Sequence, residues 1–316
     1  MSRSLADRVL AGETRALARA ITMVEENAPA ARDVLRAVFS RTGRASVIGL
    51  TGSPGAGKSS LVDQMIKDYR AAGKRVGVVA VDPSSAYSGG AILGDRVRMQ
   101  EHAMDADVFI RSMATRGHLG GLSRTTNDAI DLMDAAGYDP ILVETVGVGQ
   151  DEVEVVKTAD SVVVVLVPGM GDDIQAIKAG ILEIADIFVI NKSDRPGADR
   201  LDADLKYMLS LVDTGPRPRP PILKTVAVTG EGIPELQAIL LELGADVAEQ
   251  GRRTRSLERA SARLHAVLTD RLLRHVLALP AVAEEWDRSI GLVAERQEDP
   301  YSVVDRLMRR IELEES

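Results

Sequence analysis

The chain has 316 residues, of which 45% are hydrophobic and 27% are charged, as is ordinary for a globular protein. Its net charge of −8 argues against a general nucleic-acid or acidic-membrane surface, and no apolar run approaches the roughly 18 residues that a membrane span needs. The absence of cysteine excludes disulfides and thiolate metal sites. The charged N-terminus has no apolar stretch typical of a signal peptide, so we expect a cytoplasmic protein.

The N-terminal part of the chain is expected to be helical. Apolar residues recur at spacings near three and four over the first 28 residues, and a second helix is predicted over about residues 31–39. We favour the interpretation that these helices pack on the core of the next domain, and a partner surface is the alternative. They define a helical extension, residues 1–42.

From Arg44 onward, short apolar runs alternate with amphipathic segments, a pattern typical of a parallel sheet with crossover helices. Several runs are apolar at nearly every position, as expected of strands buried on both faces. We therefore predict an α/β fold, with a mostly parallel central sheet flanked by helices, over residues 43–244. The predicted strands are Val47–Leu50, Val76–Val81, Val108–Arg111, Ile141–Val143, Val162–Val167, Ile187–Ile190 and Ile222–Val228.

Residues 245–316 are predicted to form a helical C-terminal region. One charged helix is expected over residues 245–279, ended by Pro280, and a last helix over about residues 302–313. Leucine and valine residues give the first of these helices an apolar stripe. Such a stripe is either core or a subunit interface, and the sequence favours neither.

A glycine-rich loop between the first predicted strand and a predicted helix fits the phosphate-loop pattern G-x-x-x-x-G-K-[ST] at every position. In such loops backbone N–H groups turn toward a phosphate, and the helix N-terminus adds partial positive charge. We expect Lys58 to contact the outer phosphates and the Ser59 hydroxyl to bind Mg²⁺. The residues assigned to nucleotide binding here are Gly52, Ser53, Pro54, Gly55, Ala56, Gly57, Lys58, Ser59 and Ser60.

A second motif, Asn191-Lys192-Ser193-Asp194, follows a predicted strand and matches the N-K-x-D pattern of GTP-binding proteins. The Asp194 carboxylate is suited to accept hydrogen bonds from N1–H and the exocyclic amino group of guanine. Adenine offers no such pair of donors, so the buried acceptor would stay unpaired at a cost of about 1–3 kcal/mol. Lys192 is expected to lie along the base and brace the phosphate loop, and Asn191 to tie neighbouring segments together. The predicted nucleotide is GTP.

Three acidic residues are candidates for the Mg²⁺ site. Glu144 ends a predicted strand in Glu144-Thr145-Val146-Gly147, where many GTPases have aspartate in D-x-x-G. Its longer side chain is suited to act through a metal-bound water or to position the attacking water. Asp82 ends another predicted strand, and Asp95 lies in a glycine-rich segment. Taken singly, each of these two would be an ordinary turn residue.

Two further glycine-rich segments follow predicted strands. The first contains His118, which is either a partner contact or, as is more common for a lone histidine in a loop, a structural or solvated residue. The second, Gly169–Lys178, is acidic and follows the carboxyl end of a strand, where it is expected to move with nucleotide state.

Together these stretches resemble those of the MeaB/ArgK-like P-loop GTPases, relatives of the human methylmalonic aciduria type A protein. The order and spacing of the motifs agree across roughly residues 40–235, and the helical ends look like the family's flanking extensions. The segments that carry the resemblance are residues 52–59, 82–85 (Asp-Pro-Ser-Ser), 88–96, 111–121 and 144–150.

The resemblance implies a homodimeric GTPase whose C-terminal helices contribute to the dimer. It implies that GTP is used to gate the loading of adenosylcobalamin into methylmalonyl-CoA mutase and to protect that enzyme. GTP, GDP and Mg²⁺ are the implied ligands, and neither nucleic acid nor membrane is an expected partner.

The family's functional residues carry over to matching positions of this chain. Lys58 and Ser59 correspond to the phosphate and Mg²⁺ contacts, and Asp194 corresponds to the guanine reader. The resemblance places Asp82, Asp95 and Glu144 in the Mg²⁺ site or the switch segments. We assign catalysis to Lys58, Asp95 and Glu144.

The base-binding loop departs from the family pattern. Relatives often have Ser-Ala before the equivalent of Gly230-Glu231-Gly232, where a backbone N–H meets guanine O6, and this chain has Val226-Ala227-Val228. We expect Ala227 to keep the backbone contact, without the support of a serine hydroxyl.

Two alternative functions stay open. A metal-delivery GTPase would hold its metal with clustered Cys and His, whereas this chain has no Cys and 4 dispersed His. A transport-linked nucleotide-dependent kinase would move the γ-phosphate to a protein, and N-K-x-D favours GTP over ATP. Hydrolysis without a partner is expected to be slow, because the sequence places no arginine finger or catalytic glutamine.

Overall fold

The computed structural model describes residues 3–82, 100–102, 104–114, 121–145, 158–169, 185–211, 218–246 and 249–314. The chain divides into two compact units, Met1–Arg259 and Ala260–Ser316, each of which is described by itself. The domain boundaries expected after residues 42 and 244 stay predictions.

The first unit is built on a seven-stranded sheet in the order β3-β2-β4-β1-β5-β6-β7, and every neighbouring pair is parallel. Each predicted apolar run forms a strand, so the predicted α/β fold is confirmed. The strands are β1 (Val47–Thr51), β2 (Val76–Asp82), β3 (Val108–Ala114), β4 (Ile141–Thr145), β5 (Ser161–Leu166), β6 (Ile187–Asn191) and β7 (Ile222–Thr225).

The last strand is shorter than the sequence predicts. β7 ends at Thr225, and the Val226 carbonyl accepts hydrogen bonds from the N–H groups of Thr229 and Gly230, at 3.0 and 3.1 Å. These bonds close a turn, so residues 226–228 leave the sheet although all three are apolar.

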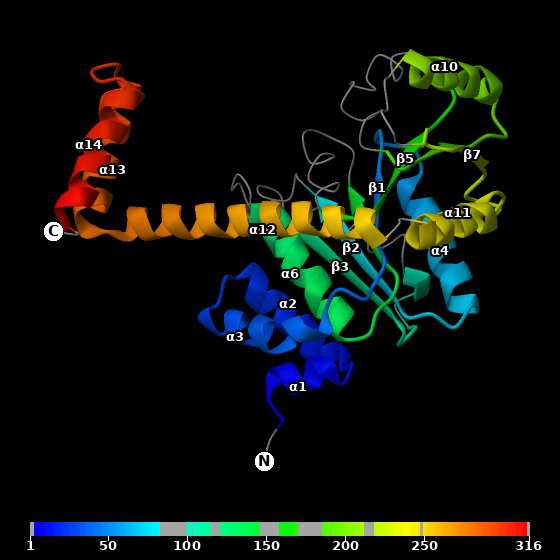
Figure 1. Cartoon of the computed structure of the whole chain (residues 1–316), viewed down its shortest axis with the longest axis horizontal. Coiled ribbons are helices and arrows are strands. Elements are labelled where there is room, and N and C mark those ends of the chain that lie inside the picture. The colour runs from blue at the N-terminus through cyan, green and yellow to red at the C-terminus, as the bar shows by residue number, and fades with distance from the viewer. Residues whose placement is uncertain are drawn as a thin grey trace. The chain divides into compact units, whose positions relative to one another are not determined.

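Helices cover both faces of the sheet (Figure 1). α4 (Lys58–Ala71) and α11 (Ile233–Asp246) bury their apolar residues with Leu50 and Leu142 on one face. α6 (Gly121–Ala135) and α10 (Ala198–Leu211) pack with Val143 on the other. Successive side chains of a strand point to opposite faces, so the apolar strands supply both cores.

The N-terminal residues form three α-helices, where the sequence predicts two. α1 (Leu5–Leu10) and α2 (Thr14–Glu25) are separated at Gly12, whose φ of +74° suits glycine. α3 (Pro29–Val38) follows, and a 3₁₀ turn, η1 (Phe39–Arg41), ends the segment. The buried faces of these helices belong to the same apolar cluster as α6.

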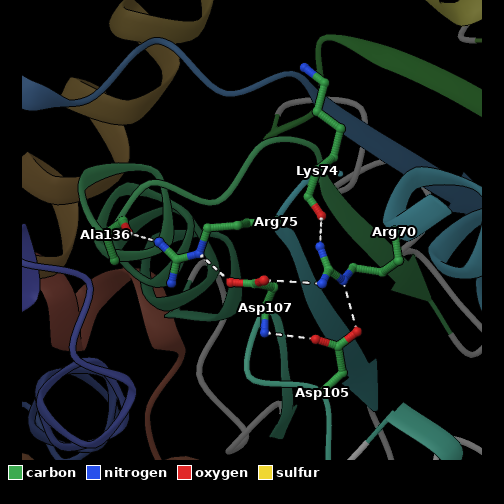
Figure 2. Close-up of polar contacts among 6 residues, drawn as sticks. All are labelled: Arg70, Lys74, Arg75, Asp105, Asp107 and Ala136. Carbon is green, nitrogen blue, oxygen red and sulfur yellow. Dashed lines mark hydrogen bonds and ion pairs between the residues drawn. The ribbon is translucent and has the colours of Figure 1, made fainter. Parts of the chain in front are cut away.

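A charged network joins the end of α4 to the beginning of β3, at the amino ends of the strands (Figure 2). Arg70 pairs with Asp105 at 2.8 Å and with Asp107 at 3.0 Å. Arg75 pairs with Asp107 at 3.2 Å and donates to the Ala136 carbonyl at 2.7 Å. The hydrogen bond from Arg70 lowers the pKa of Asp105 below its ordinary value.

The fully buried ring of Tyr138 lies beneath the Arg75 guanidinium, with 4.3 Å between the guanidinium carbon and the ring centroid. Its hydroxyl has no hydrogen-bond partner within the described ranges. A buried hydroxyl without a partner costs about 1–3 kcal/mol, so Tyr138→Phe should leave the free energy of unfolding unchanged or raise it by about 1 kcal/mol. Urea unfolding measures this change. Tyr138→Leu, which loses the ring, should destabilise the protein, and a similar loss in Tyr138→Phe would contradict an unpaired hydroxyl.

The second unit contains the end of α12 (Glu249–Ala278) together with α13 (Pro280–Ala294) and α14 (Pro300–Glu314). Helix α13 is absent from the sequence prediction. The sequence prediction interprets Pro280 as a helix end, and Pro280 is also the first residue of α13. Proline has no N–H, and at the first position of a helix an N–H would have no acceptor within the helix.

α13 and α14 run antiparallel. The buried Glu285 of α13 pairs with Arg306 and Arg310 of α14, each at 3.0 Å, and Arg306 also donates to Ser289 at 3.2 Å. The buried apolar cluster of the described part of this unit is small, comprising Val282, Val303 and Leu307. In neither unit does a described helix have the length and hydropathy needed to cross a membrane.

Candidate functional site

The phosphate-loop motif connects β1 to α4 at the carboxyl edge of the sheet. Gly57, the residue before α4, has a φ of +89°. A Cβ on Gly57 would lie 2.3 Å from Asn191 Nδ2, and one on Gly52 would lie 2.1 Å from the Val165 carbonyl oxygen. The loop is therefore packed too closely against β5 and β6 for any side chain at these two positions.

Lys58 turns back over this loop. Its side chain is buried, and Nζ donates to the carbonyl oxygens of Gly52 at 2.6 Å and Ser53 at 3.0 Å. A buried ammonium needs such partners, because an unpaired charge away from water is costly. The positive charge is thereby held at the centre of the loop.

Ser59 and Glu144 meet at the beginning of α4. Ser59 Oγ donates to Glu144 Oε1 at 2.6 Å, and Glu144 is 9% exposed. A hydroxyl and a carboxylate are oxygen ligands of the kind that Mg²⁺ prefers, and Mg²⁺ in nucleotide sites commonly uses one or two carboxylates together with phosphate oxygens. The pair fits a Mg²⁺ ion bound together with a nucleotide. In the described ranges no three His, Asp or Glu residues gather into a separate metal cluster.

A cavity of about 420 Å³ opens over the loop. Among the predicted acids, Glu144 lines it directly, and Asp82 ends β2 immediately after Val81, another lining residue. Asp95, His118 and residues 170–178 lie outside the described residues. The lining residues are Pro54, Gly55, Gly57, Lys58, Ser59, Ser60, Ala80, Val81, Glu144, Thr145 and Lys192.

The buried amide of Asn191 joins three segments. Its Nδ2 donates to the Ala56 carbonyl in the phosphate loop at 2.9 Å. Its Oδ1 accepts from the Thr225 hydroxyl at 3.2 Å and from the Ala227 N–H at 3.1 Å. One side chain thus fixes the phosphate loop to the end of β7 and to the loop after it.

Lys192 and Asp194 differ from Asn191 in exposure. Lys192 has a φ of +55°, and its Nζ donates to the Gly55 carbonyl at 2.7 Å, so the lysine braces the phosphate loop at the cavity that it lines. Asp194 is exposed, and its carboxylate has no partner among the described residues. This acceptor is available to a ligand with two adjacent donors.

The loop after β7 is held through its backbone, and its contact with guanine stays a prediction. The Ala227 N–H, expected to meet guanine O6, donates to Asn191 Oδ1. Val226 is buried and Val228 is exposed. The reason is the turn closed by the Val226 carbonyl, which directs the Ala227 N–H toward Asn191.

Buried threonines at strand ends are the part of the site that the sequence motifs do not predict. Thr225 contacts Asn191, and Thr145 donates to Thr51 Oγ1 at 3.2 Å beside Glu144. The available signal was a threonine at the last position of each of these strands.

Comparisons with known proteins agree with this geometry. Residues 17–281 match the family described as Methylmalonyl Co-A mutase-associated GTPase MeaB. A relative from Pyrococcus horikoshii, whose name classes it among GTPases, is 47% identical over 315 residues, covering 97% of each chain. The Mus musculus protein named Methylmalonic aciduria type A homolog, mitochondrial, is 36% identical over 293 residues, covering 87% of this chain and 71% of that protein.

A solved structure extends the similarity to three dimensions. The crystal structure of a protein named LAO/AO transport system kinase superimposes with a TM-score of 0.71 at 27% identity, covering 98% of this chain and 96% of that one. The fold, the phosphate loop, the Asn191 contacts and these similarities agree, and the chain is a GTPase that belongs to the family of MeaB, the methylmalonyl-CoA mutase-associated GTPases.

Proposed function

We propose that this GTPase is a chaperone of methylmalonyl-CoA mutase: it binds GTP with Mg²⁺ in the cavity over the phosphate loop, and hydrolysis times the loading of adenosylcobalamin into the mutase and the protection of that enzyme. The observation that carries the nucleotide part is the convergence of Lys58, Lys192 and the Ser59–Glu144 pair on one cavity, over a loop that Asn191 holds in place. The partner part is supported by the family description and by the mouse relative's name.

Each residue has a distinct task in this proposal. Lys58 exchanges its bonds to the loop carbonyls for bonds to the outer phosphates, which are stronger because both partners are charged. Ser59 and Glu144 hold Mg²⁺, which when bound supplies positive charge to the phosphate oxygens. Asp194 accepts the two adjacent donors of guanine, and Lys192 covers the base while bracing Gly55.

Hydrolysis requires water to attack the γ-phosphorus as the bond to the β–γ bridging oxygen breaks, giving GDP and phosphate. Glu144 is the acidic residue among the described residues that line the cavity. Without an arginine finger or a catalytic glutamine in the described part of the site, intrinsic turnover is expected to be slow. The partner is then the natural source of acceleration.

The test is GTP turnover with and without an adenosylcobalamin-dependent methylmalonyl-CoA mutase, run in parallel with ATP. Acceleration by the mutase, with GTP alone, is the expected result. GTP turnover that the mutase does not change would contradict the assignment of the mutase as partner. It would leave the assignment of GTP as the nucleotide unaffected. A transport-linked kinase, the alternative suggested by the name of the solved relative, would instead transfer labelled phosphate from ATP to a protein.

The proposal includes a homodimer formed through the C-terminal helices. Leu257, Leu264, Leu268 and Leu272 recur along α12 at spacings of seven and four, and all are exposed, Leu264 by 72%. This spacing is that of a helix–helix seam. The small buried cluster of the second unit gives it little stability of its own, so a second copy that covers the stripe would supply the missing apolar contacts.

The double substitution Leu264→Gln/Leu268→Gln is expected to convert the dimer to a monomer, because both side chains would lie in the seam. Light scattering coupled to size-exclusion chromatography measures the mass. The matched control is Leu211→Gln, since Leu211 is an equally exposed leucine on α10 of the first unit. A double variant that keeps the dimer mass would place the interface elsewhere.

A further inference from the structure

Two buried threonines end neighbouring strands beside the proposed Mg²⁺ ligand. Thr51 is the last residue of β1 and Thr145 the last residue of β4, with exposed fractions of 0% and 1%. Thr145 Oγ1 donates to Thr51 Oγ1 at 3.2 Å, with a longer approach of 3.4 Å to the Leu50 carbonyl. Thr145 also lines the cavity, next to Glu144.

These hydroxyls are not needed to fill the sheet. The other residues of β1 and β4 before Glu144 are apolar or glycine, and valine has nearly the shape of threonine. Burying a hydroxyl without a partner costs about 1–3 kcal/mol, whereas a paired hydroxyl avoids most of that cost. The pair therefore points to a task at the strand ends.

The hydrogen bond between Thr145 and Thr51 lies one residue beyond the last backbone pairing of β1 with β4. The last register pair between β1 and β4 is Leu50 with Glu144. At the next position β1 pairs with β5 and β4 pairs with β2, through Thr51–Val164 and Val81–Thr145. The hydrogen bond between the two threonine side chains thus connects β1 and β4 one residue beyond their last register pair.

The two sides of β4 carry different groups at this end. Side chains alternate along a strand, so Glu144 points toward α4 with Leu142, and Thr145 points to the opposite face with Val143. The carboxylate is held by Ser59 on the first face, and the backbone beside it is held to β1 through Thr51 on the second.

We propose that Thr145 and Thr51 are positioning residues for Glu144. Their hydrogen bond fixes the end of β4 against Thr51, the residue immediately before the phosphate loop, which keeps the Glu144 carboxylate at Ser59 and at the Mg²⁺ bound there. This inference rests on the proposed function, because it assigns the pair to the Mg²⁺ part of that site. Residues that orient metal ligands commonly change metal affinity or activity by 10- to 100-fold when replaced.

The test compares Thr145→Val with the double substitution Thr51→Val/Thr145→Val. The single change leaves the Thr51 hydroxyl unpaired, whereas the double change removes both partners and should be close to neutral for folding. For both, the Mg²⁺ concentration that half-saturates GTP turnover should rise about tenfold. Thr145→Ser, which keeps the hydroxyl, should restore the parent value.

A binding measurement accompanies turnover. Mg²⁺ should increase the affinity for a fluorescent GDP analogue by a factor about tenfold smaller in the double variant than in the parent protein. The affinity for the same analogue in EDTA should change by less than about twofold. The matched control is Thr126→Val, because Thr126 is a buried threonine of α6 whose hydroxyl has no partner in the described ranges. It should leave both Mg²⁺ measurements unchanged.

The outcomes separate the two proposals. A double variant that folds and keeps the parent's Mg²⁺ dependence in both assays would overturn the positioning role. If GTP turnover and GDP affinity of the parent protein are independent of Mg²⁺, the proposed Mg²⁺ site is contradicted, and the positioning role with it. Loss of the Mg²⁺ effect in Thr126→Val as well would assign the change to general loosening of the fold and would also overturn the inference.

Discussion

Replacing Lys58 with alanine is expected to weaken GTP and GDP binding by about 100-fold or more while leaving the fold intact. The lysine is held over the phosphate loop by the Gly52 and Ser53 carbonyls, where an incoming phosphate would meet it. A charge-assisted hydrogen bond contributes about 1.5–3 kcal/mol, and every 1.4 kcal/mol is a factor of ten in affinity. Titration with a fluorescent GDP analogue measures the loss.

Lys206→Ala is the control for the loss of a lysine. Lys206 lies on α10, and its ammonium pairs with Asp202 at 2.9 Å on the protein surface. Such an exposed pair contributes little to stability, so nucleotide affinity and the melting temperature should match the parent. Lys58→Ala with a collapsed circular-dichroism spectrum would show that the lysine is structural, because its bonds to the loop carbonyls would then hold the fold.

Asp194→Asn is expected to weaken GTP by about 100-fold and to improve binding of xanthosine nucleotides. The carboxylate, which is free of partners in the described structure, would lose its charge and gain an N–H donor. Guanine presents donors at N1 and the 2-amino group, whereas xanthine has a carbonyl at position 2 that accepts from the asparagine amide. Two charge-assisted hydrogen bonds account for a change of this size.

Competition between GDP and XDP for the same fluorescent nucleotide measures the preference. Asp199→Asn is the matched control, since Asp199 is an exposed carboxylate at the beginning of α10 whose partner is Lys224, at 2.6 Å. It should keep the parent's preference for guanine. An Asp194→Asn variant that binds GTP as tightly as the parent would remove the base-reading role from Asp194.

The sheet was predictable because its strands are buried on both faces. Runs such as Val162–Val167 and Ile187–Ile190 are apolar at almost every position, which distinguishes them from the amphipathic helices around them. The apolar residues alone predict a strand that runs to Val228, three residues too far. The Val226 carbonyl closes a turn, so residues 227 and 228 do not continue the pairing of β7 with β6. Local signals also missed the break at Gly12 and the helix that begins at Pro280.

The candidate site was predictable where a motif fixes backbone geometry. Gly57 and Asn191 are required by contacts between segments, and both residues belong to patterns that a sequence reveals. The hydroxyl contacts of Thr51, Thr145 and Thr225 depend on which strand ends are neighbours, and that information exists only in the strand order. The direction of the Ala227 N–H likewise depends on the turn that contains this residue.

The Asn191 contacts have a consequence for how the protein is made. The phosphate loop is synthesised early, but the amide that holds it at Ala56 comes from β6 and is itself held by Thr225 and Ala227, near the end of the sheet domain. A nascent chain that stops before Asn191 therefore carries the complete glycine-rich motif without this contact, and one that stops before Ala227 lacks part of what holds the Asn191 amide. Because ligands stabilise only the state that binds them, GTP would select chains whose synthesis has passed β7, and shorter fragments would gain no protection from it.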